Sequence, residues 1–265
     1  MSVGPVAEYG LRRRPPVASE RKKAEDPGFK SQRARHIVQE AGSLMEKVVV
    51  GWSGGKDSAL ALYEVLKAKS YVVVELLTTV TQDFDRVSIH GVRRVLLEEQ
   101  AAALGFPLEE MFIRKGASDA EYENELVKIL KRHKSNGVDS VLYGDVFLED
   151  VKRYRDEMLS KIGMRGVYPL WKRDTRELAH RFIDLGFKAV ITVVDSNVLG
   201  KEFAGREYDK QFLAELPAGV DPCGENGEFH SFVYNGPIFN KPVTFTKGEV
   251  VLRENRFHYI DLVPT

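Results

Sequence analysis

Residues 48–66 read VVVGWSGGKDSALALYEVL, and this stretch decides the fold. Three valines followed by a glycine indicate a buried strand, whereas the apolar residues between 59 and 66 recur at helical spacing. The spacing of the apolar residues changes from that of a strand to that of a helix within the six residues SGGKDS at 53–58. Glycines let the backbone turn sharply there and bring its N–H groups close to an anion, and a helix N-terminus adds unpaired donors. The stretch therefore predicts a strand, a phosphate-binding loop and a helix.

The loop combines several groups that suit a phosphate. Its cofactor-binding candidates are Ser53, Gly54, Gly55, Lys56, Asp57 and Ser58. Lysine supplies a mobile positive charge, aspartate a carboxylate for Mg²⁺, and the serines supply hydroxyl groups. An ordinary strand-to-helix turn with Ser or Asp as N-cap is the alternative for a bare pair of glycines. The combined residue types favour phosphate, but the spacing excludes the common P-loop, which has four residues between its glycines and Ser or Thr after Lys.

The composition narrows the class of protein. Of the 265 residues, 43% are hydrophobic and 29% charged, as in an ordinary soluble globule. Lys plus Arg and Asp plus Glu both total 39, so the overall charge favours neither direct nucleic-acid binding nor a membrane surface. A single cysteine, Cys223, excludes an internal disulfide framework. With no long apolar run, the expected compartment is the cytoplasm.

Three segments differ in pattern. Residues 1–46 are rich in charge and proline, which predicts a flexible arm with a short helix at 36–45. Residues 47–196 alternate strand and helix, which predicts an α/β nucleotide-binding domain. We expect a five-stranded parallel sheet with helices on both faces, and 188–194 as its fifth strand. Residues 197–265 predict a smaller C-terminal α+β substrate lobe, with short antiparallel strands that include 243–246 and 250–253.

Several polar residues follow the predicted strands, where open parallel sheets bind their ligands. Asp145 comes directly after the fourth strand and Gly144, so we expect it to contact a metal ion or the substrate. Asp150 begins the next helix, where an N-cap role and a ligand role are equally supported. His90 and Arg93 begin a helix predicted at 90–104, from which they could reach a nucleotide or face solvent.

The stretch CGENGEFH at 223–230 is a second cluster of reactive groups. Glu225, Glu228 and His230 lie within six residues, which favours a substrate or acid–base site over a turn with solvated acids. In an extended strand Glu228 and His230 would share one face. One cysteine and one nearby histidine supply too few ligands for zinc. Cys223 is expected to be a small buried residue rather than a nucleophile.

The motifs together resemble a known family. SGGKDS resembles the SGGxDS signature of the PP-loop ATP pyrophosphatases. With HGVR at 90–93, GDVFLEDVKRYR at 144–155, PLW at 169–171, GR at 205–206 and CGENGEFH, the order resembles the diphthine-ammonia ligase family, also called the ATP-binding DUF71 proteins. The resemblance implies a HUP-type (Rossmann-like) domain, ATP and Mg²⁺ as cofactors, and AMP as product. It implies amide formation through an acyl-adenylate, with ammonia as nucleophile and, in diphthamide enzymes, a carboxylate on elongation factor 2.

The resemblance also assigns roles. The catalytic candidates are Lys56, Asp57, Glu225, Glu228 and His230, and Asp57 and Asp145 are the metal candidates. The substrate-binding candidates are Gly144, Asp145, Asp150, Arg153, Arg206, Asn226 and Gly227. The diphthamide branch tends to carry a Gly-Gly form of the last motif, whereas this chain has Asn226-Gly227. A different carboxylate acceptor, for example in cobalamin-related salvage, is therefore an alternative, as is a non-catalytic ATP sensor. Transfer RNA thiolation is disfavoured because paired cysteines are lacking.

Overall fold

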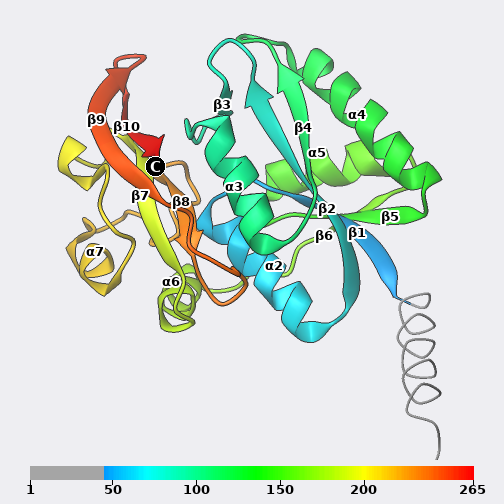
Figure 1. The fold of residues 1–265 in the computed structure, drawn as a ribbon, viewed down its shortest axis with the longest axis horizontal. Coiled ribbons are helices and arrows are strands. Elements are labelled where there is room, and N and C mark those ends of the chain that lie inside the picture. Colours follow the sequence, from blue (N-terminus) through cyan, green and yellow to red (C-terminus); the bar gives the residue numbers. More distant parts are fainter. Residues whose placement is uncertain (1–44) are drawn as a thin grey trace, which may run out of the picture. The chain divides into compact units, whose positions relative to one another are not determined.

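The computed structural model describes residues 45–265 (Figure 1). The arm expected at 1–46 and its helix at 36–45 therefore lie outside the described residues, except for their last positions, and Glu46 already belongs to the first strand. Within residues 45–265, every helix is too short or too polar to cross a membrane.

The first sheet has five parallel strands, as expected. These are β1 (Glu46–Gly51), β2 (Tyr71–Thr81), β4 (Leu108–Ile113), β5 (Val138–Leu142) and β6 (Arg165–Val167). Strands β2, β1, β5 and β6 lie in that order, and both β4 and the short antiparallel β3 (Arg86–Val87) pair with β2. The carboxyl end of β1, where the phosphate-binding loop begins, is thus central in the sheet.

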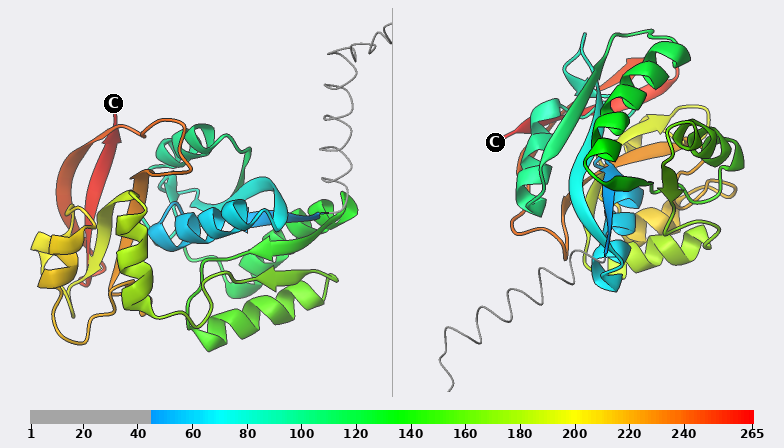
Figure 2. Two further views of the ribbon diagram at one scale, coloured as in Figure 1. Left: turned by 90° about the horizontal axis from the view of Figure 1, so that it is seen from below. Right: turned by 90° about the vertical axis from the view of Figure 1, so that its right-hand side faces the viewer.

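Side-chain alternation along β1 explains why helices cover both faces of this sheet. Val48 and Val50 join one apolar cluster, with α2 (Lys56–Ala68) and α3 (Arg94–Leu104). Val49 joins the other, with α4 (Asp119–Ser135) and α5 (Glu149–Ser160). Figure 2 shows α3 and α4 on opposite sides of the strands. A strand buried on both faces reads as an unbroken apolar run, which is what the sequence shows.

The second sheet is antiparallel and corrects one prediction. It consists of β8 (Phe229–Asn235), β7 (Lys188–Asp195), β10 (Phe257–Pro264) and β9 (Phe245–Arg253), in that order. The prediction that 188–194 is the fifth parallel strand is wrong, because β7 pairs only with antiparallel neighbours, β8 and β10. Residues 189–195 are all buried, so the run resembles a parallel strand. The change of sheet therefore precedes residue 196, and the two strands expected at 243–246 and 250–253 form one strand, β9.

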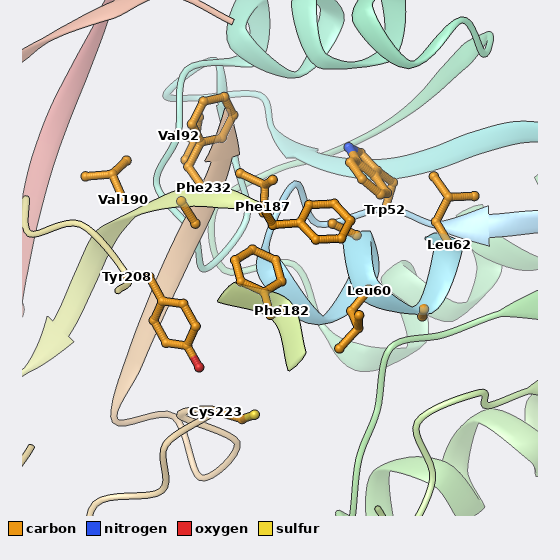
Figure 3. Close-up of a cluster of buried hydrophobic side chains, with 14 of the residues drawn as sticks. Trp52, Leu60, Leu62, Val92, Phe182, Phe187, Val190, Tyr208, Cys223 and Phe232 are labelled. Carbon is orange, nitrogen blue, oxygen red and sulfur yellow. The ribbon is translucent and has the colours of Figure 1, made fainter. Parts of the chain in front are cut away.

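Helices α6 (Thr175–Asp184) and α7 (Lys210–Glu215) and the 3₁₀ turn η1 (Lys201–Phe203) accompany the second sheet. One apolar cluster joins both sheets, as Figure 3 shows around Trp52, Phe182, Phe187 and Phe232. A backbone hydrogen bond from Val233 N to the Gly54 carbonyl, 2.9 Å, ties β8 to the phosphate-binding loop. The shared core therefore fixes the loop against the second sheet.

Candidate active site

The loop between β1 and α2 has the geometry expected for binding an anion. Gly54 has φ +77°, a left-handed conformation that suits glycine. The Ser53 and Ser58 hydroxyl oxygens lie 3.2 Å apart, and Gly55 N donates to the Ser53 hydroxyl over 3.2 Å. The N-cap residue Gly55 has no side chain to cap α2, and within residues 45–265 the Ser231 hydroxyl accepts a hydrogen bond from the first helical N–H, that of Lys56. The first-turn donors that follow Lys56 can therefore bind a phosphate.

Gln100, which no sequence motif singled out, supports this loop. The side chain is fully buried on α3, and its Oε1 accepts a hydrogen bond from the Trp52 indole over 3.0 Å. Its Nε2 donates to the carbonyls of Gly54, at 3.0 Å, and Val233. A Cβ at Gly54 would lie 2.8 Å from Gln100 Oε1. A lone amide on the apolar face of a helix was the signal available in the sequence.

Lys56 joins the phosphate-binding loop to the second motif. Its side chain is only 3% exposed, and Nζ lies 2.8 Å from Asp57 Oδ2. The same ammonium donates to the Cys223 carbonyl, 167 residues away along the chain. Its backbone N–H donates to the Ser231 hydroxyl over 3.2 Å. Burial is the largest single effect and lowers the pKa of Lys56, but the Asp57 carboxylate, together with the charges of Cys223 and Glu225, raises the pKa overall.

Two carboxylates at the end of β5 and the start of α2 fit a metal ion. Gly144 lets these elements meet, because a Cβ there would lie 2.7 Å from the Asp57 carbonyl carbon. Asp145 Oδ1 lies 3.3 Å from an Arg155 nitrogen, whereas its buried Oδ2 has no hydrogen-bond partner among the described residues. Burial raises the pKa of both aspartates, and the Asp57 charge raises that of Asp145 further. A hard cation such as Mg²⁺ would stabilise both charges, so these carboxylates suit it.

Glu225 connects the second motif to the loop that follows β5. Its Oε1 accepts hydrogen bonds from the backbone of Val146 at 2.7 Å and Phe147 at 3.3 Å. Burial raises the pKa of this carboxyl to about 7, and the two backbone donors oppose that rise. Glu225 can therefore take up or release a proton near neutral pH.

Glu228 stabilises the loop in which it lies. Its carboxylate is buried and accepts hydrogen bonds from the backbone of Asp221 at 3.0 Å and Asn226 at 2.9 Å. The Asn226 amide donates to it over 3.0 Å. Glu228 precedes β8, so these contacts turn its carboxylate back to its own loop. The nearby Gly227 has φ +85°, which a side chain would oppose.

His90 and His230 form a half-buried pair beside the phosphate-binding loop. Their ring centroids lie 4.6 Å apart, and His90 Nδ1 lies 3.4 Å from the Ser231 carbonyl oxygen. Burial lowers the pKa of both rings, that of His90 to about 4. A Cβ at Gly55 would lie 3.0 Å from His90 Cε1. The predicted helix start at 90 is wrong, because the left-handed Gly91 delays α3 until Arg94.

Other predicted residues make contacts away from these groups. Arg93 forms two hydrogen bonds to Asp261, of 3.1 and 2.7 Å. Arg206 pairs with Glu215 at 2.6 Å. Asp150 and Arg153 are exposed in the first turns of α5 and have no ion-pair partner in residues 45–265. The binding roles expected for these four residues stay predictions. As expected, Cys223 is buried, and its thiol donates to the Thr175 carbonyl.

Comparison with known proteins adds family relationships. Residues 46–166 match the family model of the diphthamide synthase N-terminal domain, and residues 174–261 that of its C-terminal domain. The Danio rerio diphthine–ammonia ligase is 28% identical over 227 residues, 77% of this chain and 88% of that protein. The Homo sapiens protein of the same name is 27% identical over 76% of this chain and 83% of its own length.

A solved structure also resembles part of the chain. It is a predicted subunit of tRNA methyltransferase from Methanocaldococcus jannaschii, with a TM-score of 0.38 and 20% identity, over 54% of this chain and 77% of that one.

The two diphthamide synthase domain models cover both sheets and both motifs of the candidate site. The chain therefore belongs to the diphthamide synthase family.

Proposed function

We propose that this chain is an ATP-dependent carbon–nitrogen ligase of the diphthine–ammonia ligase type. It adenylates a substrate carboxylate, releases pyrophosphate, and then transfers ammonia to the acyl group while AMP leaves. The contact of Lys56 with the Cys223 carbonyl carries this proposal, because it places a phosphate-binding loop beside a second cluster of ionisable groups. The names of the relatives supply the amide-forming reaction class.

The phosphate half of the reaction uses the loop and the start of α2. Backbone N–H groups at Gly54 and Gly55, with the Ser53 and Ser58 hydroxyls, hold the pyrophosphate portion of ATP. Lys56 stays protonated because of Asp57 and balances the developing negative charge. Asp57 and Asp145 would hold Mg²⁺, which supplies charge neutralisation when bound.

The acyl half uses the second motif. A carboxylate oxygen of the acceptor attacks the α-phosphorus, and ammonia then attacks the acyl carbon and expels AMP. Each amide formed releases one proton from the attacking ammonia, and Glu225, with a pKa of about 7, accepts it. His230 is neutral at pH 7 because burial lowers its pKa, so it orients ammonia by hydrogen bonding. Glu228 positions this loop through its bonds to Asp221 and Asn226.

The proposed acceptor is diphthine on elongation factor 2, and the proposed compartment is the cytoplasm. Relatives named for diphthine support the acceptor. The Asn226-Gly227 form of the last motif keeps another carboxylate acceptor as the alternative.

The test is a product assay with ATP, ammonium and diphthine-bearing elongation factor 2, in which AMP and ADP are separated. We expect acceptor-dependent AMP and pyrophosphate in equal amounts. Asp57→Asn should lower AMP release by about 100-fold or more, because it removes a charge from the proposed metal site. Asp184→Asn, which changes an exposed carboxylate paired with Lys210, is the matched control and should retain activity. ADP as product, or normal turnover in Asp57→Asn, would overturn the proposal.

A further inference from the structure

A cavity of about 540 Å³ lies where the ends of β2 and β4 approach the β9–β10 hairpin. Its lining includes Phe84, Lys115, Arg253 and Tyr259. None of the groups assigned above to phosphate or metal lines it. The cavity is therefore distinct from the phosphate-binding loop.

One short segment separates this cavity from the loop. Ser88, Ile89 and Gly91 line the cavity, whereas His90 between them contacts the Ser231 carbonyl and the His230 ring. We call residues 88–91 the strap. Ile89 has φ +69° and is 70% exposed, a costly conformation for a β-branched residue. Such strain is typical of functional sites. The strap lies between the cavity and the groups contacted by His90.

The C-terminal hairpin holds the strap in place. Gly91 packs against Tyr259, since a Cβ there would lie 2.5 Å from the tyrosine ring. Arg86 donates to the Gly91 carbonyl over 2.8 Å and to Asp261 over 2.9 Å. Arg93 also bonds to Asp261. These contacts make the hairpin one wall of the cavity.

The charges of the cavity favour an anionic group. Lys115 Nζ lies 5.2 Å from the centre of the Phe84 ring, and the Arg253 guanidinium lies 5.8 Å from the same ring and 6.0 Å from that of Tyr259. Neither cation has an ion-pair partner within residues 45–265. The lining cations Arg86 and Arg114 are paired, with Asp261 and Glu121 respectively.

Glu254 is the remaining carboxylate of the lining, so the unpaired lining groups Lys115, Arg253 and Glu254 together carry one net positive charge.

The rim of the cavity is apolar as well as cationic. Phe84, Ile89 and Val251 line the cavity and are 45%, 70% and 37% exposed. Clustered exposed apolar side chains of this kind mark a protein contact.

We propose that this cavity binds an acidic segment of the protein acceptor next to its reactive side chain, with Arg253 and Lys115 facing a carboxylate of that segment and the apolar rim contacting the surface around it. The proposal rests on the ligase function above and assigns the acceptor side of the same reaction. The strap would then hold the acceptor close to His90, His230 and the phosphate-binding loop.

The test measures binding and turnover separately. The double variant Arg253→Gln/Lys115→Gln is compared with the control Arg176→Gln/Lys131→Gln, which removes two exposed charges on α6 and α4. The probe is diphthine-bearing elongation factor 2, and its equilibrium affinity is measured without ATP. We expect the cavity variant to bind about 10-fold more weakly and the control to bind like the wild type. Arg253→Lys/Lys115→Arg, which keeps both charges, should restore most of the affinity.

Turnover then separates the two proposals. In the AMP assay, the cavity variant should show a KM for the acceptor raised about 10-fold, with little change in kcat and in the affinity for ATP. Unchanged acceptor affinity and KM in the cavity variant would overturn the cavity assignment and leave the ligase function standing. Acceptor binding that depends on the cavity, without any AMP release by the wild type, would overturn the ligase function instead.

Discussion

A buried lysine is the residue on which the site depends. Desolvation disfavours the ammonium of Lys56, yet Asp57 and the Cys223 carbonyl keep it charged. Phe229 and Tyr208 enclose it, with ring centres 5.3 and 5.8 Å away. A charge held this way needs no reorganisation when negative charge develops nearby. The same contact would be lost if either motif moved, so Lys56 ties the two motifs together.

Gln100 provides a prediction about stability. Gln100→Leu keeps the approximate volume but leaves the Trp52 indole and the Gly54 and Val233 carbonyls without this partner. Unpaired buried polar groups are costly, so we expect the free energy of unfolding to fall by about 2–4 kcal/mol. Urea denaturation measures it, with Gln211→Leu on the exposed face of α7 as control. Equal stability of the two variants would contradict the role given to Gln100.

Glu225 provides a prediction about pH. Its carboxyl has a pKa of about 7, so the proton-accepting carboxylate form becomes dominant as the pH rises above 7. The rate of amide formation, expressed per unit of free ammonia, should therefore rise through about pH 7 and then level off. Glu225→Gln should lose this rise and fall by about 100-fold at pH 8. An unaltered pH profile in the variant would show that another group accepts the proton.

At the scale of elements, Asp261 on β10 joins the hairpin to the strap. Hydrogen bonds from Arg93 lower the pKa of Asp261 most, burial opposes this effect, and Arg86 adds to it, so that the pKa falls to about 2. A carboxyl group with a lowered folded-state pKa stabilises the fold above its ordinary pKa, near 4, and this contribution is lost as the pH falls toward 2.

Asp261→Asn should consequently be less stable than the wild type at pH 7, and the difference should shrink steadily below pH 4. Urea unfolding at pH 7, 4 and 3 measures it. Asp139→Asn, which removes an exposed carboxylate paired with Lys134, serves as the control. A difference between Asp261→Asn and the wild type that is the same at all three pH values would contradict the ion-pair explanation.

Local patterns predicted most elements but not every strand partner. The change in apolar spacing at 53–58 located the loop between β1 and α2, because the strand and the helix each show their own spacing in the sequence. Strand β7 was assigned to the wrong sheet because burial on both faces looks the same in parallel and antiparallel strands. The three-residue strand β6 was missed because it is too short to show a period.

The candidate site shows the same limit. Asp57, Asp145, Glu225 and His230 could be selected by residue type and position. Contacts between distant segments could not be predicted, because no local pattern reports them. The pairing of Arg93 with Asp261, and the bonds of Gln100 to Gly54 and Val233, became visible only in the folded chain.

At the scale of the whole described chain, two sheets share one apolar core, and each sheet supplies one half of the site. The parallel sheet contributes the phosphate-binding loop and Asp145. In the antiparallel sheet, β8 contributes His230, and the segment leading into β8 contributes Glu225. Because the core fixes these halves against one another, adenylation and amide formation can proceed at one place without release of the activated acceptor.

Transfer of labelled oxygen tests this account most directly. The acceptor carboxylate on elongation factor 2 is labelled with ¹⁸O and incubated with the protein, ATP and ammonium, and the AMP is examined by mass spectrometry. Attack of the carboxylate on the α-phosphorus leaves its oxygen on AMP when ammonia displaces it. We expect one ¹⁸O atom in each AMP formed from fully labelled acceptor. Label in inorganic phosphate, or unlabelled AMP formed together with labelled amide, would contradict it.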